Sequence, residues 1–447
     1  MKYNIIYIHT HDSGRYWSPY GYDVPTPNVM EFAKKSTTFR NCFCAGPTCS
    51  PSRSGLLTGT YPHQNGMLGL AHRGFALYDY HDHIANYLKD SGFKSVLCGV
   101  QHVAAHKSTI GYDTIVGTKD KDLFDPVSME KWDRDNADAL CTYLQKTKSE
   151  KKPRFVSMGF FSTHRKYPAP DPSVVNADYI HAPFPIADCP ETRQDMAGYC
   201  QSAHIFDECF GKVVTSLEQN GYFENSIILL TTDHGIAFPQ MKCTLYDTGI
   251  GVACIVYYPG NHANGTVCDA LVSQLDIFPT LCELEGLEKP ERLQGVSLLP
   301  LLEKKSAAVR KEIFAEINYH AAYEPARCVR TDRYKYIRRY LAYDKPVLSN
   351  IDPSLSKTML LSNGLAEKKG VASEMLFDLL FDPCERINLI NDVSYASCAA
   401  KMSADLDDWM KKTADPILTY GARIPKPDGA VVNTLSCINP KDLDYEL

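Results

Sequence analysis

Short apolar runs alternate with longer amphipathic stretches over residues 1–309. Each apolar run is the length of a buried strand and predicts one; these runs lie at residues 5–8, 94–97, 155–161 and 226–232. Apolar positions at helical spacing predict helices over residues 29–34 and 192–219, the second ending at Asn220-Gly221. This alternation predicts an α/β domain with a largely parallel sheet sandwiched by helices.

The pattern changes after the polar stretch at residues 303–306. Shorter strand-like segments follow at residues 313–317, 326–330 and 334–340, and an amphipathic helix is expected at residues 399–411. We therefore predict two domains: a catalytic domain at residues 1–309 and a smaller C-terminal α+β domain with an antiparallel sheet at residues 310–447.

The composition is that of an ordinary globular protein, with 44% hydrophobic and 22% charged residues. The net charge of −6 offers no basic face for nucleic acid. The N-terminal apolar run is too short for a signal peptide, and no apolar window is long enough to span a membrane. Sixteen scattered cysteines without CxxC pairs favour reduced thiols over disulfides. We therefore expect a cytoplasmic, bacterial protein without nucleic-acid or membrane partners. The sequence leaves open whether the protein forms an oligomer.

The strongest chemical signal is the stretch at residues 49–59, which begins Cys49-Ser50-Pro51-Ser52-Arg53. Ser50 suits an N-cap and Pro51 a first helical residue, so Cys49 is expected just before a helix. Backbone N–H groups and the positive end of the helix dipole would face it, which suits an anionic substrate. Arg53, one turn later, is expected to point toward the same end. The alternative interpretation is a capped helix with a buried cysteine.

Two acidic–histidine pairs predict a metal site. His11-Asp12 follows the first strand, and Asp233-His234 follows another strand that is apolar enough to be central. Both pairs should lie at the carboxyl edge of the sheet, where α/β proteins place ligands. Two carboxylates and two imidazoles beside a helix N-terminus are typical of a divalent-cation site, although each pair alone could be a cap and turn.

The stretch at residues 49–59 resembles the signature of the type I sulfatases, members of the alkaline-phosphatase superfamily whose Cys-x-Pro-x-Arg cysteine becomes formylglycine. Among these it is most similar to the heparan N-sulfatase (sulfamidase) branch. Other stretches share the family's order and spacing: His63-Gln64-Asn65-Gly66-Met67, Thr163-His164, Asp233-His234-Gly235, Lys242-Cys243-Thr244-Leu245-Tyr246-Asp247, Cys328-Val329-Arg330-Thr331, and Leu376-Phe377-Asp378 to Asn388-Leu389. The resemblance implies an alkaline-phosphatase-like fold, hydrolysis of a sulfate ester or sulfamate on a saccharide, and a formylglycine-generating maturation enzyme as partner.

The resemblance also implies roles for individual residues. In the family, one hydroxyl of the hydrated aldehyde attacks sulfur and the other then expels sulfate. His102 would contact these hydroxyls, His164 would donate a proton to the leaving group, and Lys242 and Arg53 would stabilise charge on the sulfuryl oxygens. The expected metal ligands are His11, Asp12, residue 49, Asp233 and His234. We expect His72, Arg73 and His320 near the sugar, the alternative being that they are exposed loop residues.

Two positions depart from the family pattern. His11 stands where sulfatases usually carry an aspartate, and Val100 stands where related enzymes carry a lysine. Family usage predicts calcium, whereas an imidazole ligand favours manganese or zinc.

Two other functions stay open from the sequence. A phosphonate monoesterase or phosphodiesterase of the same superfamily uses the same nucleophile motif, but a site short of one lysine favours the less charged sulfuryl group. A non-catalytic sugar-binding relative would fit the two departures, but it would not need the intact Cys49 and Arg53 motif.

Overall fold

The computed structural model describes residues 2–118 and 125–440, and its main feature is a nine-stranded sheet in that part of the chain. Five neighbouring strands at one side of this sheet are parallel, in the order β4-β3-β5-β1-β6. They are β4 (Thr114–Val116), β3 (Lys94–Gly99), β5 (Arg154–Gly159), β1 (Asn4–His9) and β6 (Ser226–Thr231). The sheet continues with β8 (Cys254–Tyr257), β2 (Thr37–Phe43), β7 (Gly251–Val252) and β9 (Thr266–Ser273), where β2 and β8 run antiparallel and β2 and β9 parallel. The predicted largely parallel α/β architecture is confirmed.

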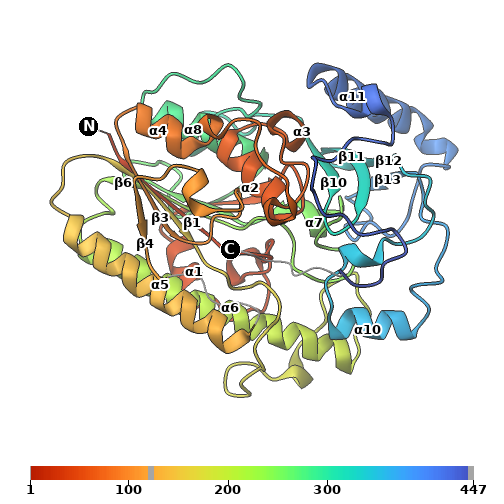
Figure 1. The fold of residues 1–447 in the computed structure, drawn as a ribbon, viewed down its shortest axis with the longest axis horizontal. Helices are drawn as coiled ribbons and strands as arrows, with labels where there is room; N and C mark the ends of the chain where they lie inside the picture. The colour runs from red at the N-terminus through yellow and green to blue at the C-terminus, as the bar shows by residue number, and fades with distance from the viewer. Residues whose placement is uncertain (1, 119–124, 441–447) are drawn as a thin grey trace.

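Helices cover both faces of the large sheet, because alternate residues of each strand point to opposite sides. Ile6 and Ile8 of β1 pack into one core, and Ile5 and Tyr7 into the other. The first core is closed by α1 (Pro27–Ala33), α5 (Pro126–Thr147) and α6 (Pro190–Gln219). The second is closed by α2 (Cys49–Thr58), α4 (Ile84–Asp90) and α8 (Ile277–Leu284). Figure 1 shows α5 and α6 together on one side of the sheet and α4 and α8 on the other.

A second sheet of four antiparallel strands follows in the C-terminal part of the chain. Its strands are β10 (Glu312–Tyr319), β11 (Tyr323–Thr331), β12 (Tyr334–Arg339) and β13 (Glu374–Asp378). Helix α11 (Ala396–Lys412) packs on it, with Trp409 stacked on Phe314 at a ring-centroid distance of 5.1 Å. The remaining α-helices of the described residues are short: α3 (Pro62–Asn65), α7 (Asp247–Ile250), α9 (Leu299–Leu302), α10 (Leu355–Ser362) and α12 (Ile417–Tyr420). No helix among the described residues is long and apolar enough to cross a membrane.

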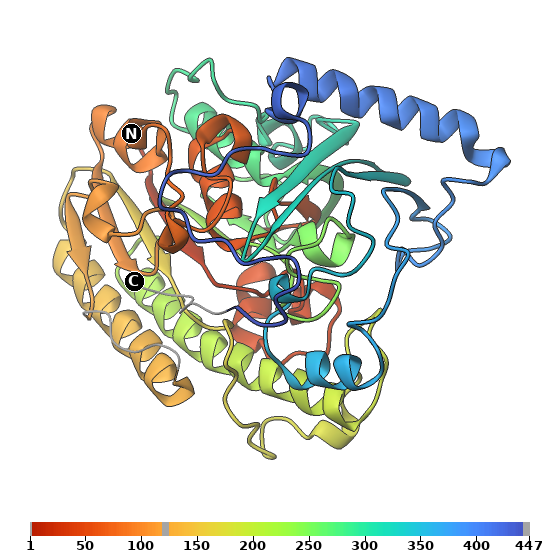
Figure 2. The same ribbon diagram turned by 45° about the vertical axis from the view of Figure 1, so that its right-hand side comes forward.

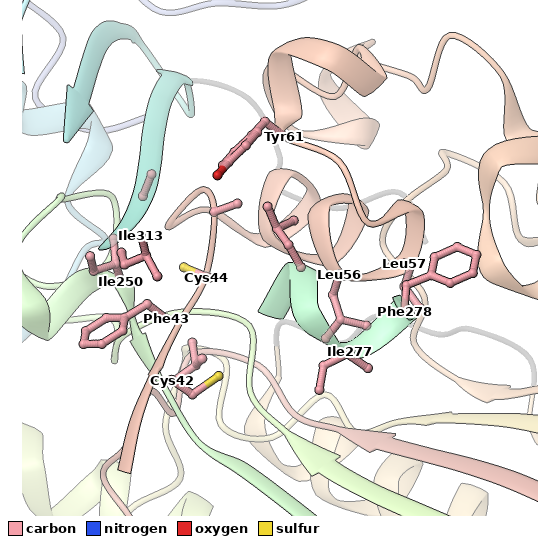
Figure 3. Close-up of a cluster of buried hydrophobic side chains, with 14 of the residues drawn as sticks. Cys42, Phe43, Cys44, Leu56, Leu57, Tyr61, Ile250, Ile277, Phe278 and Ile313 are labelled. Atoms are coloured by element: carbon pink, nitrogen blue, oxygen red, sulfur yellow. The ribbon is translucent and has the colours of Figure 1, made fainter. Parts of the chain in front are cut away.

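The two sheets share one hydrophobic core. Figure 3 shows Leu56 and Leu57 of α2 beside Phe278 of α8, and Ile313 of β10 beside Ile250. The predicted boundary at residues 309–310 precedes β10 but stays a prediction, because the hydrophobic contacts run across it without a break.

Buried charges join the second sheet to the segment after α11. Arg327 of β11 is fully buried and binds both carboxylate oxygens of Asp415, at 2.6 and 3.0 Å. Its Nε also lies 3.6 Å from Glu316 Oε2, and that carboxylate contacts the ring of His63 in α3. The histidine of the His63-Gln64-Asn65-Gly66-Met67 stretch therefore has a structural role.

We expect Arg327→Leu to lower the free energy of unfolding by about 3–5 kcal/mol, because it leaves two buried carboxylates without their guanidinium. Urea denaturation followed by fluorescence would measure this change. The matched control is Arg134→Leu, whose exposed pair with Glu208 at 2.7 Å should be worth at most about 1 kcal/mol. Equal losses in the two variants would contradict a structural role for the buried pair.

Candidate active site

The site lies at the carboxyl ends of four neighbouring parallel strands. The order β3-β5-β1-β6 brings together the segments that follow these strands, which carry His102, His164, His11-Asp12 and Asp233-His234. Parallel strands end at the same edge, so residues distant in sequence meet there. The sheet edge predicted from the sequence is the one observed.

Cys49 faces this edge from the start of α2. The helix begins at Cys49 with Thr48 as its N-cap, so the prediction of Ser50 as N-cap was wrong by two positions. Ser50 Oγ instead accepts the Ala71 N–H at 3.0 Å. Cys49 Sγ lies 3.3 Å from His234 Nε2 and 4.0 Å from Asp12 Oδ1. The cysteine therefore meets both predicted metal-binding pairs at the positive end of the helix.

Asp233 holds these segments together. Its Oδ1 accepts the backbone N–H groups of Asp12 at 2.8 Å and His234 at 2.9 Å. Its Oδ2 accepts Arg53 Nη2 at 3.0 Å, so the signature arginine neutralises a carboxylate rather than facing an open space. Arg53 Nη2 also donates to Thr10 O at 3.0 Å, which binds α2 to the segment after β1.

Lys242 links the site to the C-terminal half of the chain. Its Nζ lies 2.9 Å from Asp12 Oδ2 and 2.9 Å from Asp352 Oδ2. Burial opposes ionisation of both carboxyls, but Lys242 and nearby histidines hold the pKa of Asp12 and of Asp352 below its ordinary value. The sequence analysis missed Asp352, which lies in a loop without any pattern that points to a site.

Burial favours the neutral forms of His11, His72, His102 and Cys49. It lowers the pKa of His11 and His102 well below the ordinary value, and with Arg73 it lowers that of His72 to about 3. It raises the pKa of the Cys49 thiol well above its ordinary value, and the carboxylates of Asp12 and Asp233 add to this effect. A buried neutral thiol is a poor nucleophile, because the thiolate is the reactive form.

Three non-glycine residues with positive φ lie in or beside the site: Asp12 (44°), His102 (55°) and Cys243 (63°). Such left-handed backbone costs free energy and persists only where surrounding contacts impose it. Here the hydrogen bond from Asp12 N to Asp233 holds the first of these residues in place.

The predicted sugar-binding residues lie beside the site but are not exposed. His72 Nδ1 is 3.1 Å from His102 Nε2, while Arg73 and His320 are buried. The segment at residues 430–439 lies against them, because Arg73 Nη1 donates to Asn433 Oδ1 at 2.9 Å and Asn433 N donates to Ala321 O at 2.8 Å. Figure 2 shows this dark-blue segment crossing the front of the molecule. The interpretation of Arg73 and His320 as exposed loop residues is wrong, and Asn433 is a second neighbour that sequence analysis missed.

A cavity of about 360 Å³ between the segment at residues 239–248 and the second sheet adjoins the site. Of the candidate residues, Lys242 lines this cavity, together with Glu324, Arg339 and Asn350.

A second group of metal-ligand types, His63, Glu316 and Asp415, also lies within the described residues. The Arg327 guanidinium contacts both carboxylates of this group. A cation already sits there, so the group does not need a metal.

Comparison with known proteins places these residues in a family. A family profile described as Sulfatase matches residues 3–287, and one described as N-sulphoglucosamine sulphohydrolase, C-terminal, matches residues 237–360. The chain is similar to an ulvan-active sulfatase of Formosa agariphila, with 29% identity over 93% of this chain and 81% of that protein. It is also similar to human N-sulphoglucosamine sulphohydrolase, with 25% identity over 92% of this chain and 89% of the relative.

Among solved structures, the phosphonate monoester hydrolase of Agrobacterium radiobacter has the same fold. The two structures superpose with a TM-score of 0.71 and 18% sequence identity, and the superposition covers 94% of this chain and 97% of that one. The alkaline-phosphatase-like fold implied by the sequence is thereby confirmed.

We expect Lys242→Met in metal-free protein to lower the free energy of unfolding by about 3–5 kcal/mol, because Asp12 and Asp352 then share no cation. In the double variant Lys242→Met/Asp352→Leu, the loss in the free energy of unfolding should be smaller than the sum of the losses in the two single variants. The difference, the coupling energy, should be about 0.5–3 kcal/mol. Lys289→Met, whose pair with Glu283 is exposed, is the control in urea denaturation. Strictly additive losses would contradict the direct Lys242–Asp352 contact.

Proposed function

The chain belongs to the sulfatase family, and on that premise we propose that it removes sulfate from a saccharide with a formylglycine at position 49 and one divalent metal ion. Membership of this family makes it a sulfuric ester hydrolase. The observation that carries the finer proposal is the position of Cys49, at the N-terminus of α2 within 4.0 Å of both Asp12 and His234.

The neutral, buried state of Cys49 supports its conversion. A thiol whose pKa is raised by burial would be an inert nucleophile, whereas a formylglycine hydrate supplies hydroxyl oxygen at the same place. A divalent ion held by His11, Asp12, residue 49, Asp233 and His234 would supply Lewis-acid stabilisation of the sulfuryl oxygens. The donor types of these residues fit such an ion, and both ring nitrogens of His11 lack a hydrogen-bond partner among the described residues.

The protein's own groups have separate tasks in this proposal. Arg53 neutralises Asp233 and orders the start of α2. Lys242, held between Asp12 and Asp352, places positive charge where the sulfuryl oxygens would sit. His102 stays neutral through burial, so it can accept a proton from the residue-49 hydroxyl. His164 would protonate the leaving atom as an imidazolium, a form that the Asp12 carboxylate favours, with its Nδ1–H held against Arg165 O.

A sulfate ester and a sulfamate are both candidate substrates. The match of the C-terminal part to N-sulphoglucosamine sulphohydrolase supports the sulfamate, and the ulvan-active relative supports a sulfated polysaccharide. Phosphonate hydrolysis has the support of the fold alone. Val100 is fully buried against Met129, Trp132 and Phe161, so the position where related enzymes carry a lysine adds no charge for a phosphoryl group.

A maturation enzyme that makes formylglycine is a required partner in this proposal. We propose a reducing compartment such as the cytoplasm on the basis of the sequence alone, whose sixteen cysteines are scattered without CxxC pairs.

In protein from a maturation-competent host, we expect the Cys49 peptide to be lighter by about 18 Da, the change from thiol to aldehyde. Peptide mass spectrometry measures it, with the other cysteine peptides as internal controls. Cys49→Ala should reduce sulfate release at least roughly 10³-fold while the fold is retained, whereas Cys141→Ala, at a partly exposed cysteine, should remain active. Full activity with an unmodified thiol would refute the formylglycine mechanism.

Arg73→Ala and His320→Ala should raise KM for a sulfated saccharide at least roughly tenfold more than for a small aryl sulfate, because uniform binding to the distal sugar is lost. Steady-state kinetics on both substrates measure this difference. Asn433→Ala is the control, since it removes one hydrogen-bond partner of Arg73 and keeps the guanidinium. Equal increases in KM for both substrates would place Arg73 and His320 at the sulfate. If Asn433→Ala changes KM in the same way as Arg73→Ala, the role of Arg73 is structural.

A further inference from the structure

The donor atoms at the proposed metal site include two imidazole rings. His234 Nε2 lies 3.3 Å from Asp12 Oδ1 and 3.6 Å from Asp233 Oδ2. Its other ring nitrogen, Nδ1, is 3.0 Å from the Gly235 carbonyl, a contact in which Nδ1–H donates and Nε2 keeps its lone pair toward the site. A backbone carbonyl that fixes the tautomer in this way is the usual support of a metal-binding histidine.

His11 has no hydrogen-bond partner at either ring nitrogen among the described residues, although its side chain is fully buried. Its Nδ1 lies 3.5 Å from Asp233 Oδ2. The ring is enclosed by Phe161, His102 and His164 at centroid distances of 5.3–5.6 Å. Burying an imidazole without a partner is costly, and a metal ion bound to its lone pair would remove that cost.

Few oxygen atoms remain available at the same place. Asp233 Oδ1 accepts two backbone N–H groups, and Asp12 Oδ2 is bound to Lys242. The carboxylate oxygens that remain are Asp12 Oδ1 and Asp233 Oδ2, the second of which also accepts Arg53. With an oxygen on residue 49, the protein offers about three oxygen ligands, whereas Ca²⁺ takes about 6–8.

From this donor set we infer that the site binds a first-row transition ion, zinc or manganese, in preference to calcium. Two imidazoles, two carboxylates and one residue-49 oxygen suit such an ion. This inference rests on the proposed function in treating residue 49 as an oxygen ligand, and it departs from the calcium expected from family usage.

The experiment is a binding competition that needs no turnover. Cys49→Ser protein is used, because the hydroxyl stands in for the residue-49 oxygen and no soft thiolate can bias the result toward zinc. Chelated protein is dialysed against equal concentrations of Zn²⁺, Mn²⁺ and Ca²⁺ and then measured by elemental analysis. We expect about one equivalent of zinc or manganese and less than about a tenth of calcium.

Adding His11→Asp to the Cys49→Ser protein should weaken binding of zinc and manganese at least roughly tenfold and raise calcium occupancy, because an oxygen replaces the imidazole. His81→Asp, at an exposed histidine, is the matched control and should leave the metal content unchanged. Stoichiometric calcium in the competition would overturn the inference, as would zinc retained fully after Asp12→Ala and Asp233→Ala. The metal inference and the proposed function can fail separately. If the protein binds zinc but the matured wild-type enzyme releases no sulfate, the proposed function is refuted and the metal inference still stands.

Discussion

The site depends on one carboxylate, that of Asp233. It accepts the N–H groups of Asp12 and His234 through one oxygen and the guanidinium of Arg53 through the other. These contacts join the ends of β1 and β6 to Arg53 of α2, one turn after Cys49, so the position of Cys49 follows from them. Three charge-assisted hydrogen bonds on a buried group are strong, because the low dielectric of the interior removes competition from water.

The C-terminal half of the chain completes this site. Asp352 binds Lys242, and Asn433 binds Arg73. Both contacts lie beside a hydrophobic core that the two sheets share. Cys49 is fully buried, and this burial keeps its thiol neutral. Exclusion of water strengthens every charge interaction in the site, and it is why reactivity at position 49 would require a chemical change in the residue.

Much of this could be predicted from local sequence pattern. The apolar runs predicted β1, β3, β5 and β6, and the helical spacing predicted α6, because both periodicities reflect burial on one face. The pairs His11-Asp12 and Asp233-His234 were placed correctly, since residues that follow parallel strands share an edge. The start of α2 was misplaced by two positions, as helix ends depend on tertiary contacts such as that between Ser50 and Ala71.

The sequence by itself determined the strands, the motif from Cys49 to Arg53 and the set of titratable residues at the sheet edge, because each of these rests on neighbours in the chain. Tertiary structure alone decided which groups neutralise one another. Arg53 meets Asp233 across 180 positions, and Lys242 meets Asp352 across 110. It also decided that His11 would be buried without a hydrogen-bond partner among the described residues. Such pairings depend on how loops from different strands pack together, and no local periodicity records them.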